Sequence, residues 1–290
     1  MFRRVLILVM ILIPLGVAAQ SENFPLPSVP DTLKGPRARA NYLALHYWDR
    51  YDFTDNRLIG NKDISEQGFS NFISIMPYVT EKEAAFGQLA KRMVANSLML
   101  DYFVALGIKY LYEPLSPVYN EALYILMLEK VLEQPALTED DRQEYGFDLK
   151  MASKNRPGEK AADFSFLMRD GNRSSLSKVK GDYILLFLGD PECDICIDVK
   201  EQLLASPCFM RNVENGRLKV LYVCVEGSSD AWRESPAPKQ WIDACDEKQQ
   251  ISGDLLYDIP GLPLLYLLDG EHRVLLKNVP PSYIEGFFSR

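Results

Sequence analysis

The chain has 290 residues, of which 47% are hydrophobic, and a formal net charge of −8. This length allows two domains that each bury a core, and the composition excludes a collagen, a coiled coil or a disordered chain. The acidic balance argues against binding to nucleic acid or to anionic membrane surfaces.

The N-terminus has the features of a secretory signal. Arg3 and Arg4 precede an apolar run of 15 residues from Val5 to Ala19, whereas a membrane-spanning helix needs about 20 residues. We therefore expect residues 1–19 to be a cleavable signal peptide, with an uncleaved anchor as the alternative. This places the mature chain in the periplasm or cell envelope, and no later segment predicts a membrane span.

Residues 20–152 predict an all-helical domain. From Arg37 onward, apolar residues recur at helical spacing. Thr80 and Glu83 form a capping-box pattern ahead of one long helix that reaches Val104. Ser116 and Pro117 predict the start of another helix, which runs to Leu132, and Thr138 with Asp141 predicts the last one. The sequence of this domain shows no recognisable catalytic constellation.

Residues 153–162 are polar and predict a linker to a second domain, residues 163–290. At the start of this domain apolar residues recur at every second position, as in a β-strand, and Asp170 with Gly171 predicts a hairpin turn. Strands are expected at residues 183–189, 218–225, 264–268 and 273–276, with a helical insertion that contains Trp232 and Trp241 and a terminal helix at 283–288. His272 is expected to be an exposed hairpin residue.

The strand at residues 183–189 leads into a Cys-X-X-Cys motif. Cys193 and Cys196 open a segment in which Ile195, Val199 and Leu203 recur at helical spacing. Only a thiolate attacks a disulfide, and the free N–H groups of a helix start stabilise negative charge. We expect Cys193 to be the nucleophile and Cys196 to resolve the mixed disulfide.

Two other interpretations of the cysteines stay open. Half of a zinc site is possible, although no second Cys-X-X-Cys or His-X3-His supplies the other ligands, and the pair could also be inert. Five cysteines in an exported protein leave at least one unpaired. Cys224 lies in an apolar strand and is expected to be a packed thiol, whereas Cys208 and Cys245 could pair with each other.

The motifs PGEKAADFSF, LLFLGDPECDIC and IPGLPLLYLLDGEHRVLLKN, within residues 157–290, resemble exported thioredoxin-like thiol reductases of the TlpA and cytochrome-c-maturation type. The resemblance implies an α/β thioredoxin-like domain, with a central sheet flanked by helices and an N-terminal β-hairpin. It also implies that Pro263 is a cis-proline facing the redox pair, where the backbone of Leu262 can pair with a substrate strand.

The first half, with HYWDRYDF and YLYEPLSPVYNEALY, looks like uncharacterised helical domains that precede thioredoxin-like domains in exported Bacteroidetes proteins. The second half departs from thioredoxin at three places near the redox pair. Phe187 stands where thioredoxin has a buried aspartate, and Glu192 replaces the tryptophan before the first cysteine. Asp194 and Ile195 stand between the cysteines instead of Gly-Pro, and a carboxylate beside a thiol disfavours the thiolate. We therefore expect a reductase or isomerase and not a strong oxidant.

The sequence thus predicts an exported thiol-disulfide oxidoreductase that acts through Cys193, Cys196 and Pro263. Its expected partners are disulfide-containing envelope proteins and an upstream electron donor, and the exchange needs no cofactor. A non-catalytic binding or scaffold protein is the alternative. A thiol peroxidase is disfavoured because the P-X3-T-X2-C pattern of peroxiredoxins is missing around Cys193.

Overall fold

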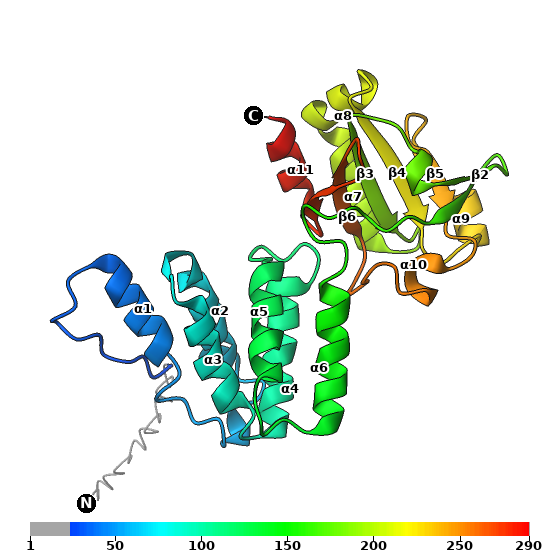
Figure 1. The fold of residues 1–290 in the computed structure, drawn as a ribbon. Coiled ribbons are helices and arrows are strands. Elements are labelled where there is room, and N and C mark those ends of the chain that lie inside the picture. The colour runs from blue at the N-terminus through cyan, green and yellow to red at the C-terminus, as the bar shows by residue number, and fades with distance from the viewer. Residues whose placement is uncertain (1–23, 290) are drawn as a thin grey trace, which may run out of the picture.

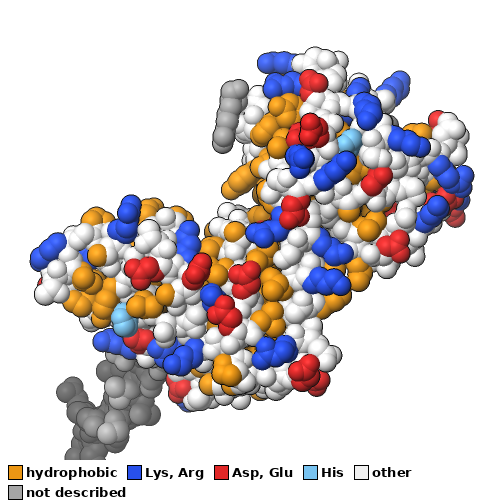
Figure 2. All heavy atoms as spheres, in the orientation of Figure 1, with side chains coloured by type: hydrophobic (Ala, Val, Ile, Leu, Met, Phe, Trp, Pro, Cys, Tyr) orange, Lys and Arg blue, Asp and Glu red, His pale blue; other side chains and the backbone are white. Residues whose placement is uncertain are grey.

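The computed structural model describes residues 24–289. The described chain forms a helical half followed by a half built on one mixed sheet, and the two halves meet beside α5 and α6 (Figure 1). Acidic and basic side chains are interspersed over the face shown in Figure 2. No helix between residues 24 and 289 is long and apolar enough to cross a membrane.

The helical half contains six α-helices and four short helical turns within the described range. The α-helices are α1 (Pro36–His46), α2 (Gln67–Ile75), α3 (Lys82–Met93), α4 (Ser97–Gly107), α5 (Glu121–Leu132) and α6 (Glu139–Ala152). The turns span Asn56–Leu58, Lys62–Glu66, Met76–Tyr78 and Ile108–Tyr112. Aromatic rings fill the core, where Trp48 contacts Phe72 and Phe103 at centroid distances of 5.5 and 5.2 Å. These buried rings supply much of the hydrophobic stabilisation of this half.

The predicted helix starts are partly wrong. The long helix expected from Thr80 is two helices, because the side chain of Asn96 accepts from the backbone N–H of Leu98 and caps α4. The expected capping box does not form, since the Thr80 hydroxyl instead accepts from the side chain of Asn41 at 2.8 Å. The next helix begins at Glu121 and not at Pro117, because Asn120 caps it.

Thr138 does cap α6 as predicted, because its hydroxyl accepts from the N–H of Asp141 at 3.1 Å. We expect Thr138→Ala to lower the free energy of unfolding by about 1 kcal/mol, since an N–H of the first turn loses its partner. Denaturant unfolding measures this change. Thr138→Ser keeps the hydroxyl and serves as the control, and an equal loss in both variants would contradict a capping role.

The second half contains seven strands and five α-helices within the described range. The strands are β1 (Ser165–Met168), β2 (Arg173–Ser175), β3 (Tyr183–Gly189), β4 (Leu218–Cys224), β5 (Ile242–Cys245), β6 (Leu264–Asp269) and β7 (Val274–Lys277). The helices are α7 (Asp194–Ala205), α8 (Pro207–Glu214), α9 (Asp230–Glu234), α10 (Gln250–Gly253) and α11 (Pro281–Phe288), with a short turn at Leu176–Lys178. The strand order is β2-β1-β5-β4-β3-β6-β7.

Strand β3 is central and is buried on both faces, as its apolar sequence predicts. It pairs in parallel with β4 and antiparallel with β6. Leu185 and Phe187 point to the face covered by α7, α8 and α11, whereas Ile184 and Leu186 point to the other face. The end of β3 is therefore held rigidly, and the Cys-X-X-Cys segment follows it directly.

Two local predictions in this half are wrong. Trp241 does not lie in a helix, because it directly precedes β5, a strand that the sequence did not suggest. His272 is buried, and its Nε2 lies 3.1 Å from the carbonyl oxygen of Val179. Residues 153–162, the predicted linker, connect α6 to the sheet half, and the N–H of Gly158 donates to Val274 O at 2.8 Å at the edge of β7.

Candidate functional site

The redox pair lies where β3 passes into α7. Cys193 is the N-cap residue of α7, and its Sγ accepts from the backbone N–H of Cys196 at 3.2 Å. The Asp190 side chain holds the approach to the helix by accepting from the N–H of Glu192 at 2.9 Å. A sulfur at this position faces the positive end of the helix dipole, so negative charge on Cys193 is stabilised there.

The two thiols differ in access. Cys193 is half-buried, whereas Cys196 is 2% exposed, and both are free thiols in this structure. Burial raises the pKa of Cys196 well above its ordinary value, and the neighbouring Cys193 sulfur raises it further. Cys196 therefore keeps its proton at neutral pH, and Cys193 is the thiol that a partner can reach.

Pro263 forms the second wall of the site. The Leu262–Pro263 peptide bond is cis, and Pro263 directly precedes β6. The carbonyl oxygen of Leu262 lies 4.0 Å from Cys193 Sγ. The backbone of Leu262 therefore lies beside the accessible thiol, where an extended segment of a partner can pair with it.

The surroundings of the pair differ from the sequence prediction at one residue. The buried face of α7 consists of Cys196, Val199 and Leu203, whereas Ile195 is 52% exposed. The sequence predicted that Ile195 would share the buried face with Val199 and Leu203. In the structure the next residue, Cys196, takes this place, and one residue corresponds to a rotation of about 100° around the helix axis. Ile195 thus adds an apolar side chain to the surface next to Cys193.

No carboxylate occupies the core beneath the pair at the position of Phe187. The Phe187 ring is fully buried and lies 5.3 Å from the Tyr222 ring and 6.2 Å from that of Trp241. Glu192 and Asp194 are exposed beside Cys193. Glu192 and Asp194 therefore place negative charge at the outer rim of the site, and the half-buried Asp190 carboxylate adds to burial in raising the pKa of Cys196.

The other three cysteines are free thiols too. Cys224 on β4 and Cys245 on β5 lie opposite each other in the register of the two strands without a disulfide between them. Both are fully buried, and burial raises the pKa of each to about 11. Cys208 lies on α8 with its Sγ 3.5 Å from the Ser289 hydroxyl. The alternative bridge between Cys208 and Cys245 is not formed. Among residues 24–289, no group of three or more His, Cys, Asp or Glu side chains is placed to hold a metal ion.

The two halves contact each other through residues that the sequence did not suggest, and one of them, Asp258, lies in the loop that leads to Pro263. The Tyr112 hydroxyl donates to the Asp258 carboxylate at 2.8 Å, and Lys277 Nζ lies 3.0 Å from Glu121 Oε2. Burial raises the pKa of Asp258 and of Glu121 and lowers that of Lys277. No local pattern marks these residues, because their partners lie more than a hundred positions away.

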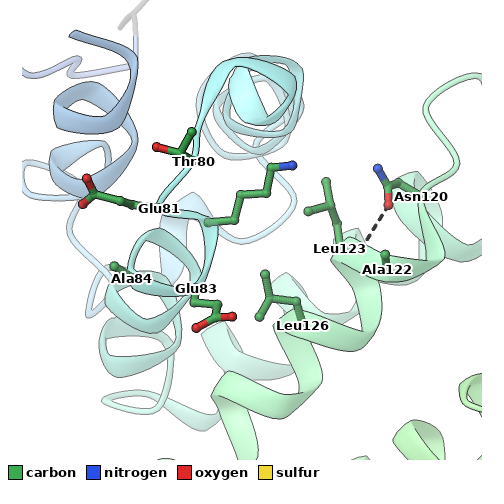
Figure 3. A pocket seen from close by; sticks show the side chains of 9 residues that line it. Thr80, Glu81, Glu83, Ala84, Asn120, Ala122, Leu123 and Leu126 are labelled. Carbon is green, nitrogen blue, oxygen red and sulfur yellow. Dashed lines mark hydrogen bonds between the residues drawn. The ribbon is translucent and has the colours of Figure 1, made fainter. Parts of the chain in front are cut away.

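A separate cavity of about 690 Å³ lies between the N-terminal ends of α3 and α5. Figure 3 shows Leu123 and Leu126 of α5 on one side of it and Glu83 of α3 on the other. None of its lining residues is a cysteine or belongs to the loop before β6. This hollow is therefore not part of the redox site.

Comparisons with known proteins agree with this architecture. Residues 13–155 match the family model "Domain of unknown function (DUF5106)". A thioredoxin-like protein from Bacteroides caccae is 33% identical, with 92% of this chain and 98% of that chain covered and a TM-score of 0.80.

Two further solved structures align with about half of this chain. A conserved protein of unknown function from Bacteroides fragilis is 34% identical (46% and 98% covered, TM-score 0.44). The thioredoxin domain of a thiol-disulfide oxidoreductase from Bacteroides vulgatus is 21% identical (46% and 98% covered, TM-score 0.39).

No curated protein matches the chain. The relative from Bacteroides caccae spans both halves, so it shows the family of the whole described chain and not of one domain alone. The chain therefore belongs to a family of thioredoxin-like proteins in which a helical DUF5106 domain precedes the thioredoxin-like domain.

Proposed function

We propose that this chain is an exported thiol-disulfide oxidoreductase that reduces or isomerises disulfides in envelope proteins. The observation that carries the proposal is the placement of Cys193 Sγ at the start of α7, 4.0 Å from the Leu262 carbonyl and above a buried Cys196 thiol. Such a site presents one reachable sulfur, a second sulfur behind it and a backbone edge for the partner.

In the reductive direction, the Cys193 thiolate attacks one sulfur of a partner disulfide. A Cys193–partner disulfide forms, and the other partner sulfur leaves as a thiolate that takes up a proton. Cys196 then loses its proton and attacks Cys193, which forms the Cys193–Cys196 disulfide and releases the second partner thiol. The partner gains two electrons, and a dithiol electron donor of the envelope restores the reduced pair.

The exposed carboxylates of Glu192 and Asp194 support the reductive or isomerising direction. Negative charges next to Cys193 oppose the stabilisation that the helix start provides for the thiolate. A strong oxidant requires a very stable reduced thiolate, and this rim does not favour one. Arg3, Arg4 and the apolar run that follows, which lie outside the described residues, support export.

The mature protein is expected to catalyse the reduction of insulin by dithiothreitol. Cys193→Ser should react at the uncatalysed rate, because a hydroxyl does not attack a disulfide, and Cys196→Ser should be slower than wild type. Cys208→Ser removes a thiol outside the site and should match wild type. Equal rates for wild type, Cys193→Ser and Cys196→Ser, with an intact fold, would instead favour the scaffold function.

A further inference from the structure

The loop that carries Leu262 and Pro263 is contacted by the helical half. Tyr112, at the end of the turn Ile108–Tyr112, donates its hydroxyl to Asp258 Oδ2 at 2.8 Å. Asp258 is half-buried and lies inside the loop between α10 and β6, five residues before Pro263. A hydrogen bond to a carboxylate is among the stronger kinds, so it restrains this part of the loop.

A second contact lies closer to the cysteines. A Cβ placed on Gly261 would lie 3.7 Å from Cδ of Pro114, so the Pro114 ring lies beside the backbone at Gly261. Leu115 packs against the same cluster of side chains as Cys193 and Leu262, a cluster that includes the buried Cys196. The helical half therefore reaches the wall of the redox site itself.

The contacting segment, residues 112–115, is rigid for reasons that lie within the helical half. The Tyr112 ring is 2% exposed and stacks on the Tyr124 ring of α5 at 4.6 Å. The Ser116 hydroxyl donates to the Tyr110 carbonyl at 2.7 Å. Leu115 has φ of 68°, a left-handed conformation that costs a leucine about 1 kcal/mol and persists where the surroundings fix it.

We propose that residues 112–115 are a positioning element of the redox site. Tyr112 acts through Asp258, and Leu115 acts by packing, to hold the Leu262 backbone at the distance from Cys193 at which a substrate strand can pair with it. This role rests on the proposed oxidoreductase function. It gives the helical domain a task in recognising extended protein segments, whereas small disulfides that form no strand pairing depend on it less.

The test compares two Tyr→Phe variants that each remove one hydroxyl bonded to an aspartate. Tyr112→Phe is expected to raise the KM for insulin by roughly threefold to tenfold, the range of a single hydrogen bond. Its effect on the reaction with hydroxyethyl disulfide should be smaller. Tyr145→Phe loses the 2.7 Å bond to Asp101 inside the helical half and should leave both reactions unchanged.

Hydrogen exchange of the backbone amides of Ile259, Gly261, Leu262 and Leu264 provides a readout that needs no activity. Tyr112→Phe should exchange faster there than wild type and Tyr145→Phe. If wild type reduces no insulin but exchange rises in Tyr112→Phe, the positioning contact stands and the proposed function fails. If Tyr112→Phe matches Tyr145→Phe in both measurements, the positioning role is overturned.

Discussion

The Cys196→Ser variant is expected to accumulate covalent mixed disulfides with envelope proteins. Cys193 is half-buried and can attack a partner, but a serine at position 196 cannot release the complex that forms. Wild type should show few such species, because the Cys196 thiol lies directly behind Cys193. Non-reducing electrophoresis of envelope fractions, followed by mass spectrometry of bands that vanish on reduction, measures the effect.

The matched control for this trap is the double variant Cys193→Ser, Cys196→Ser. It keeps Cys208, which is half-buried and is therefore the other thiol that a partner could reach among the described cysteines. The same bands in the double variant would assign the capture to Cys208 and contradict the proposed site. Bands specific to Cys196→Ser would identify the substrate proteins directly.

The core of this site could be predicted from the sequence because its signals are local. Strand β3, the turn after it and the start of α7 are consecutive in the chain, and a buried parallel strand followed by Cys-X-X-Cys has a clear pattern. The resemblance to thioredoxin-like proteins then pointed to Pro263. The Cys193 to Leu262 contact joins residues 69 positions apart, so the resemblance, and not the periodicity, suggested it.

Helix ends were less predictable, because several residues compete for each cap. Thr80 and Ser116 are acceptable N-caps in isolation, but Asn96 and Asn120 take that role in the structure. Thr80 is bonded to Asn41 of another helix, a contact that no local pattern reveals. A capping pattern thus establishes that a helix can start nearby, whereas tertiary contacts decide where it does.

The contact between the two halves was not predictable at all. Tyr112 and Asp258 are separated by 146 positions, and each reads as an ordinary residue of its own segment. Lys277 follows the apolar residues of β7 and would be expected in solvent, yet it is 2% exposed. Its charge is stabilised by Glu121 and by carbonyl groups that only the folded arrangement brings together.

Lys277→Met is expected to lower the free energy of unfolding by about 3 kcal/mol, because the buried Glu121 carboxylate loses its nearest cation and keeps only Arg156, 3.8 Å away, and the Tyr119 hydroxyl at 3.2 Å. In wild type, Lys277 Nζ lies 3.0 Å from Glu121 Oε2 and donates to the carbonyl oxygens of Ala152 and Lys154 at 2.8 and 2.7 Å. All of these bonds are lost in the variant. Thermal or denaturant unfolding measures the change.

Two variants show whether the cost arises from the buried Glu121 charge that has lost its nearest cation. Glu121→Leu combined with Lys277→Met removes both charges and should recover most of the lost stability, because apolar side chains replace a buried pair at little cost. Lys130→Met breaks the pair with Glu133, which is 59% exposed, and should cost no more than about 0.5 kcal/mol. A double variant as unstable as Lys277→Met would contradict this explanation.

The direction in which the pKa of Glu121 is shifted predicts how the stability deficit of Lys277→Met depends on pH. Burial raises the pKa of Glu121, and removing Lys277 deletes the nearest charge that lowers it. A carboxyl with a raised folded-state pKa favours the fold fully below its unfolded pKa of about 4.3 and loses that contribution as the pH rises through the folded pKa. The deficit of Lys277→Met should therefore be largest at neutral pH and shrink as the pH falls toward 4.5. A deficit that is constant from neutral to acidic pH would show that the lost carbonyl bonds, and not the weakened pairing of the Glu121 carboxylate, dominate the effect.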